Sequence, residues 1–120
     1  MKPVLTRAVA ALEKGLNLTL ASVPDGFDAL AVADLARSLS GKAEGPAVLV
    51  HVARDGLRQQ NFVNGLGFIA PEIEILPFPA WDCLPYDRVS PNSGVTAQRM
   101  TTLARLTRSK TSEERPRILS

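Results

Sequence analysis

The sequence predicts a layered α/β domain in which helices flank a mainly parallel β-sheet. Two observations lead to this prediction. Segments with helical and extended hydrophobic patterns alternate along the chain, and the connections between them are short except around residues 78–94. The length of 120 residues suits one domain with a modest core. We therefore expect residues 1–120 to form a single α/β domain.

The first half of the chain contains two predicted helices and two predicted strands. Apolar residues recur at helical spacing over residues 4–14, and Gly15 follows as a stop signal. Residues 27–39 form an amphipathic pattern with Phe27, Leu30, Ala31, Leu35 and Leu39 on its apolar face. The strands are predicted at residues 17–22 (NLTLAS) and at residues 47–52 (AVLVHV). The second of these is nearly continuous in apolar residues, which predicts burial on both faces.

The second half continues the alternation. Helices are predicted at residues 55–66, with Leu57, Phe62, Val63 and Leu66 on one side, and at residues 95–110. Strands are predicted at residues 72–76 and 116–120. The alternation in residues 72–76 places that strand near a sheet edge, and Glu72 and Glu74 are interpreted as part of a solvated edge.

The composition excludes several kinds of site. A single cysteine excludes an internal disulfide and a cysteine-cluster metal site, and a single histidine excludes a histidine-rich zinc site. We expect no metal and no cofactor in this chain. The net charge of +2 is too small to indicate nucleic-acid binding by itself. No apolar run approaches the ~20 residues of a membrane helix, so the sequence predicts a cytoplasmic protein without a membrane partner.

In a nucleotide-binding α/β domain, phosphate binds at the turn between the first strand and its helix. Here that turn lies within residues 20–29, LASVPDGFDA. Aligning a P-loop on it places Ala21 and Gly26 at the two glycines, Phe27 at the lysine and Asp28 at the Ser/Thr. A phenyl ring cannot neutralise phosphate, and nearby carboxylates repel it. The sequence therefore predicts a degenerate phosphate turn, like that of a helicase first motor domain which has lost its nucleotide.

The other candidate residues have structural interpretations. We expect Asp25 to cap the helix at 27–39, or Asp28 to serve as a first-turn acid favoured by the helix dipole. His51 stands alone at the end of a strand and is interpreted as structural. Cys83 has no base beside it and is interpreted as a passive thiol. The sequence predicts no catalytic residue.

The segment FPAWDCLPYDRVSPNSG, residues 78–94, contains the chain's single Trp, Cys and Tyr together with several prolines. Prolines lack an N–H donor and fix φ, so they favour a stiff crossover from strand to helix. Aromatic rings in such a crossover can bury large apolar faces. We predict that Trp81 is largely buried and that Trp81→Ala costs about 3–5 kcal/mol of stability. Asn92 or Ser93 is expected to cap the next helix.

This segment and the helix after it resemble the N-terminal region of bacterial transcription-repair coupling factors. Their pattern is Trp-[Asp/Glu]-x-Leu-Pro-Tyr-Asp-x-x-Ser-Pro, followed by a helix that starts with Ser/Ala-x-Arg-[Met/Leu]. The matching residues are Trp81, Asp82, Leu84, Pro85, Tyr86, Asp87, Ser90, Pro91 and Gln98-Arg99-Met100. Before residue 45 the resemblance is weaker. There VPDGFDALAVADLARSL corresponds to a segment that holds a P-loop in the related excision-repair B subunit and is degenerate in the coupling factors.

The resemblance implies a parent protein with several domains. Such a parent is an ATP-dependent DNA translocase that displaces stalled RNA polymerase and recruits the excision-repair A subunit. The resemblance places the ATP and Mg²⁺ in a motor domain after Ser120, and the polymerase, DNA and A-subunit contacts in other later domains. This chain would be a non-catalytic N-terminal scaffold or regulatory domain, with the rest of the parent as its partner. The strand pattern at residues 116–120 agrees with a fragment of a longer chain.

A second function is also compatible with the residues. A helicase-type domain could still hold a nucleotide or a DNA strand, using cations on or near the last helix: Arg99, Arg105, Arg108 and Lys110. The alternative interpretation of these cations is a solvated face and a favourable charge at the C-terminal end of the helix. A flavodoxin-like ligand domain is a third possibility, but no loop of the sequence supports it.

Overall fold

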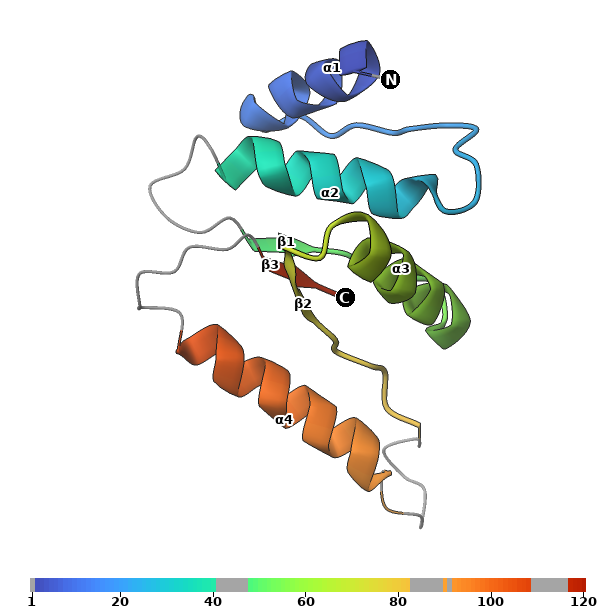
Figure 1. Ribbon diagram of the computed structural model, residues 1–120, viewed down its shortest axis with the longest axis vertical. Helices are drawn as coiled ribbons and strands as arrows, with labels where there is room; N and C mark the ends of the chain where they lie inside the picture. The colour runs from blue at the N-terminus through green and yellow to red at the C-terminus, as the bar shows by residue number, and fades with distance from the viewer. Residues whose placement is uncertain (1, 41–47, 83–89, 91, 109–116) are drawn as a thin grey trace.

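The computed structural model describes residues 2–40, 48–82, 90, 92–108 and 117–120 (Figure 1). From residue 27 onward helices and strands alternate over these residues, which confirms the α/β class. The elements are α1 (Lys2–Glu13), α2 (Phe27–Ser40), β1 (Val48–Val50), α3 (Gly56–Ile69), β2 (Glu74–Leu76), α4 (Ser93–Thr107) and β3 (Arg117–Leu119).

The described strands form one parallel sheet in the order β1-β3-β2. Ile118 of the central strand pairs with Leu49 on one side and with Ile75 on the other. Parallel neighbours require crossover connections, and α3 and α4 lie in those crossovers. The parallel sheet and the place of β2 at an edge of it are therefore as predicted.

The core lies between the sheet and the pair α2 and α3. Phe62 and Leu66 of α3 are buried there against Ile118 of β3. Helix α2 packs on α3 and also on α1, while α4 lies on the opposite side of the sheet from α2 (Figure 1). The result is a layered arrangement with helices on both sides of the strands.

The buried face of α2 differs in part from the one expected, although Ala31 is buried as predicted. Ala29, Ala33 and Ala36 enter the core, while Leu30 and Leu35 are half-buried. Small residues are needed there because α3 approaches closely: a Cβ on Gly65 would lie 3.4 Å from the Cβ of Ala29. In α3, Phe62 and Leu66 are buried as expected, but Leu57 is exposed because it lies in the first turn, beyond the edge of the core.

The predicted strand at residues 17–22 is wrong. Residues 16–25 form an irregular, exposed connection between α1 and α2. Alternation of Leu16, Leu18 and Leu20 with polar residues favours a strand only where a neighbouring edge supplies hydrogen bonds. In Figure 1 the connection passes on the α1 side of α2, away from the sheet, so no such edge lies beside it.

The predicted burial of both faces of β1 is also wrong. Val48, Val50 and Val52 are 49%, 67% and 85% exposed, whereas Leu49 packs against the core. Strand β1 is an edge of the described sheet, and the contacts of α4 are made with β2 and β3. Among the described residues, the core helices pack on the face of β1 that carries Leu49.

Candidate functional site

The crossover from β2 to α4 is organised by Asp82 and Asn92. The two carboxylate oxygens of Asp82 accept the N–H of Asn92 at 3.1 and 3.3 Å. The side-chain oxygen of Asn92 accepts the N–H of Gly94 at 2.8 Å and so caps α4. This confirms the expected Asn92 cap. It also gives Asp82 a definite task, because its carboxylate holds the capping residue in place.

Arg99 connects α4 to the other end of the same crossover. Its Nη1 donates to the carbonyl oxygen of Pro79 at 2.7 Å. Its Cζ lies 3.8 Å from the ring centroid of Phe78 and 4.4 Å from that of Trp81. A guanidinium placed over aromatic faces is attracted by the ring quadrupole while its edge remains free to donate hydrogen bonds. Arg99 therefore has a positioning role in the structure.

The predicted burial of Trp81 is wrong. The residue is 50% exposed. It lies beyond the end of β2 and away from the core beneath α2 and α3, and its described ring contact is with the cation of Arg99. The cost of truncating it must accordingly be smaller than that of a core aromatic residue.

The rest of the family motif is described only in part. Ser90 is exposed. Leu84, Pro85, Tyr86, Asp87 and Pro91 lie outside the described residues, as does Cys83.

Helix α4 is fastened to the sheet by polar contacts. The hydroxyl of Thr102, which is buried, donates to the carbonyl oxygen of Pro77. Arg105 forms an ion pair with Glu74. Arg117 Nε of β3 lies 3.0 Å from Glu74 Oε2. The expectation of a solvated edge is therefore wrong for Glu74, whose side chain is 18% exposed, and agrees with Glu72, whose side chain is 51% exposed and pairs with Arg37.

Two of the four cations considered for DNA have side-chain partners in the fold. Arg99 and Arg105 are engaged with the crossover and with Glu74. Arg108 is the C-terminal cap residue of α4, and its backbone N–H bonds to the carbonyl of Ala104 at 3.2 Å. Lys110 lies outside the described residues.

The residues predicted to form a degenerate phosphate turn lie just before and at the start of α2. Ala21 is exposed, Gly26 has φ +85°, and Phe27 begins the helix. Asp28 is the first-turn acid that was expected, and its Oδ1 accepts the N–H of Ala29 at 2.9 Å. Asp25 has a different partner, Arg58 Nη1, at 3.2 Å.

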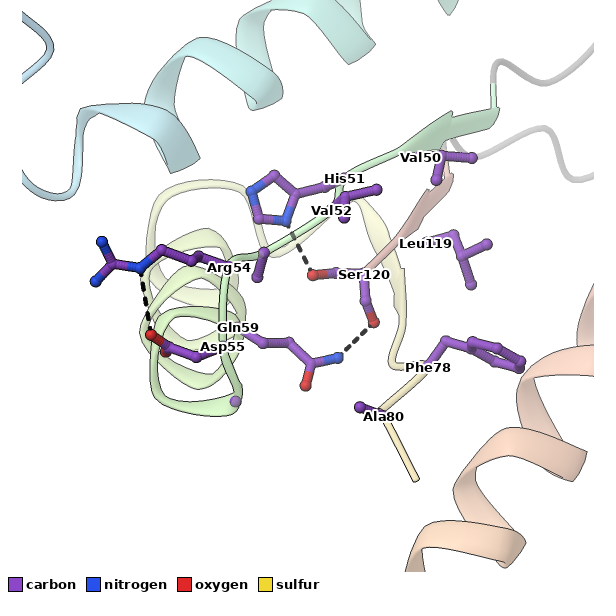
Figure 2. A pocket seen from close by; sticks show the side chains of 12 residues that line it. Val50, His51, Val52, Arg54, Asp55, Gln59, Phe78, Ala80, Leu119 and Ser120 are labelled. Atoms are coloured by element: carbon purple, nitrogen blue, oxygen red, sulfur yellow. Dashed lines mark hydrogen bonds and ion pairs between the residues drawn. The ribbon is translucent and has the colours of Figure 1, made fainter. Parts of the chain in front are cut away.

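A cavity of about 330 Å³ opens at the carboxyl end of the sheet (Figure 2). Val50, Val52, Leu119 and Phe78 give it a mainly apolar lining. Ser120 is hydrogen-bonded within it: its Oγ lies 3.0 Å from His51 Nδ1, and its backbone oxygen accepts from Gln59 Nε2 at 2.7 Å. Ser120, His51 and Gln59 are thus hydrogen-bonded to one another in the wall of a mainly apolar cavity, which Arg54 and Asp55 also line.

His51 sits in this wall as a packed residue. Its ring stacks on Phe62 with centroids 3.6 Å apart and planes at 8°. Burial lowers the pKa of the imidazole below its ordinary value of 6.5, and the nearby negative charge of Asp28 opposes that shift. The stacking and the bond to Ser120 support the structural interpretation of His51.

A second hollow of about 320 Å³ lies between the start of α2 and the start of α3, lined by residues that include Asp28, Arg54 and Arg58. Arg54 pairs with Asp55 at 3.5 Å, and Arg58 pairs with Asp25. In the part of the chain that the structure describes, no three His, Cys, Asp or Glu side chains are grouped to hold a metal ion. Nor is any described helix long and apolar enough to cross a membrane.

Comparison with known proteins shows one partial likeness. A stretch of 43 residues, 36% of this chain, is 42% identical to the transcription-repair-coupling factor of Rickettsia bellii (strain RML369-C). The match covers 4% of that protein's length. No protein-family model and no solved structure matches the chain. The likeness is to the same family that the motif around Trp81 resembles.

Proposed function

We propose that this chain is a non-catalytic scaffold or regulatory domain in the N-terminal part of a transcription-repair coupling factor. The observation that carries the proposal is that the described motif residues have structural contacts and do not line a cavity. Asp82 and Arg99 hold the crossover between β2 and α4, and neither lines the cavity at the carboxyl end of the sheet. The 42% identity over 43 residues supports the family relation.

The chemistry of the turn before α2 supports the absence of a nucleotide site. A phosphate bound there would face the carboxylates of Asp25 and Asp28, and Phe27 supplies no charge. The two cations that line the hollow beside Asp28 are already paired, Arg58 with Asp25 and Arg54 with Asp55. We therefore propose that the turn is a degenerate form of a phosphate loop and that this chain neither binds nor hydrolyses ATP.

In this proposal the partners belong to the parent protein. The motor that binds ATP and Mg²⁺, and the domains that contact DNA, RNA polymerase and the excision-repair A subunit, follow residue 120. The domain described here contacts other domains of the same protein. The cell compartment is the cytoplasm.

The alternative of a DNA-binding helicase-type domain rests on the basic residues of α4. Arg99 and Arg105 already have protein partners that would be lost in binding phosphate. Titrating a fluorescent duplex with this chain at low salt should give no saturable binding. Affinity that falls steeply with salt, and that disappears on Arg105→Ala while Gln98→Ala leaves it intact, would favour the DNA-binding alternative.

The family relation is tested by reading the gene beyond codon 120. The proposal expects an uninterrupted reading frame in which a helicase motor with an intact Gly-x4-Gly-Lys-Ser/Thr loop follows several domains later. A reading frame that continues without any motor contradicts the coupling-factor assignment.

A further inference from the structure

The strand β3 fills a gap between β1 and β2 that is one strand wide. Ladder hydrogen bonds join β3 to β1 on one side and to β2 on the other. Neighbouring strands lie about 4.8 Å apart, so β1 and β2 are about 10 Å apart and cannot bond each other across the gap. The strand that fills the gap follows α4 and comes after both of its neighbours in the chain. The ladder groups that β1 and β2 direct at the gap therefore depend on residues 117–120 for their partners.

The middle of the gap is lined by the apolar core. Ile118 is fully buried there, in one cluster with Phe62 and Leu66 of α3. Side chains alternate along a strand, so Arg117 and Leu119 lie on the other face of the sheet. A slip of β3 by one residue would turn Ile118 out of the core, and burial of this side chain therefore limits the register.

The first residue of β3 is held by charge. Arg117 Nε lies 3.0 Å from Glu74 Oε2 of β2. Arg117 Nη1 also donates to the carbonyl oxygen of Arg105 in α4 at 3.3 Å. Because the side chains of Arg117 and Glu74 are only 14% and 18% exposed, this ion pair is shielded from water more than a surface pair is.

The other end of the strand is held by hydrogen bonds from three elements. The N–H of Ser120 donates to the carbonyl oxygen of Leu76 at 3.1 Å, and the Ser120 carbonyl oxygen accepts from the N–H of Phe78. The same oxygen accepts from Gln59 Nε2 of α3 at 2.7 Å, and Ser120 Oγ lies 3.0 Å from His51 Nδ1 (Figure 2). Both the backbone and the hydroxyl of Ser120 are therefore recognised.

We propose that the gap between β1 and β2 is a strand-binding site for an extended segment with a cation first, a β-branched apolar residue second and a hydroxyl residue fourth. In this chain the segment is β3 with Ser120. A slip of two residues would move it by about 6.6 Å and break the contacts of Arg117 and Ser120 together. Because the segment itself makes these contacts, it binds even when the chain between α4 and β3 is cut. This inference does not depend on the proposed function.

The full chain tests the site, with the recognition sequence of a specific protease inserted between residues 110 and 111. The cut protein is unfolded in urea and refolded with an excess of fluorescein-labelled peptide of residues 111–120. The label should elute with the large fragment in gel filtration, and an excess of unlabelled peptide should suppress its uptake. The uncut chain is the control and should take up little label, because its own strand is present at high effective concentration. A cut chain that fails to refold with the peptide, or that refolds without taking it up, overturns the proposal.

Variants of the peptide test the chemistry of the site, since a peptide of this length has no fold of its own to lose. Ile118→Asp should abolish the uptake. Arg117→Ala should weaken binding by about tenfold, and Glu74→Gln in the large fragment should cause a similar loss. Together the two changes should cost little more than either alone, because both remove the same ion pair. Equal uptake of the Ile118→Asp peptide, or fully additive losses at Arg117 and Glu74, contradicts the site.

Discussion

The guanidinium of Arg99 lies over the ring of Trp81, with Cζ 4.4 Å from the ring centroid. The same group covers Phe78 and bonds to the carbonyl of Pro79. Because Arg99 is in the second turn of α4 and the other three residues follow β2, this one side chain fixes how the helix leaves the crossover. The motif residues that the structure describes therefore have a structural role: they fasten the crossover after β2 to α4.

Replacing Arg99 should weaken the contact between the crossover and α4 and so lower the stability of the fold. Arg99→Ala removes two cation–π contacts and a charge-assisted hydrogen bond, and we expect a loss of about 1–2 kcal/mol of stability. Arg99→Lys should recover only part of it, since an ammonium group cannot stack as a planar guanidinium does. Urea unfolding followed by circular dichroism measures both. Gln98→Ala, at an exposed neighbour on α4, is the control, and an equal loss in that variant would contradict the assigned role.

Truncating Trp81 should cost less than the sequence predicted. At 50% exposure, Trp81→Ala should lower the free energy of unfolding by about 1–2 kcal/mol, because half of the apolar surface is already in water. The emission maximum of the native protein should lie between those of buried and fully hydrated tryptophan. A loss above about 3 kcal/mol would restore the original expectation of a core residue.

Two leucines of α3 give a matched test of the core. Leu66 is fully buried against Phe62 and Ile118, so Leu66→Ala should cost about 2–5 kcal/mol. Leu57, on the same helix, is 72% exposed, and Leu57→Ala should change stability by less than about 0.5 kcal/mol. Chemical denaturation measures the free energy of unfolding of both variants. Similar losses in the two would contradict the position of the core beneath Leu66.

Glu74 should matter more than Glu72. Glu74→Gln leaves the guanidinium of Arg117, which is 14% exposed, without its ion-pair partner, and we expect a loss of about 1–3 kcal/mol. Glu72→Gln removes an exposed pair with Arg37 and should cost less than about 1 kcal/mol. Thermal unfolding at low and at high salt separates the two, because only the exposed pair should be screened strongly. A Glu74→Gln variant as stable as the parent would contradict the pairing.

The lowered pKa of His51 predicts a pH dependence of stability. Burial favours the neutral imidazole in the folded state, so the unfolded chain binds the proton first as pH falls below 6.5. Stability contributed by this group should therefore be present at about pH 8 and decline toward about pH 5.5. The slope of stability against pH in this window should be shallower in His51→Gln. Identical slopes in the two proteins would mean that His51 titrates alike in both states.

The sequence predicted the elements that have strong internal signals. Residues 27–39 and 95–110 have helical periodicity, and α2 and α4 occupy nearly those ranges. Asn92 was expected as a cap because Asn accepts backbone hydrogen bonds at helix starts, and it serves as one. The parallel sheet followed from the alternation of helices and strands.

The sequence could not predict which elements lie next to one another in the folded chain. The apolar run at residues 47–52 looks the same for a central strand as for an edge strand, and only the position of β3 between β1 and β2 decides which it is. The alternation at residues 17–22 would be a strand beside an open edge and is a loop without one. The partners of Trp81 and Glu74 are set by α4 crossing the sheet, a contact between residues far apart in the chain.

The central claim is that the turn before α2 binds no nucleotide. Isothermal titration of residues 1–120 with ATP in the presence of Mg²⁺ tests it directly, on protein shown to be folded by circular dichroism. The account predicts heats no larger than those of dilution up to millimolar ATP, because Asp25 and Asp28 repel the phosphates and Phe27 offers no charge. Saturable, Mg²⁺-dependent binding in the micromolar range would contradict it.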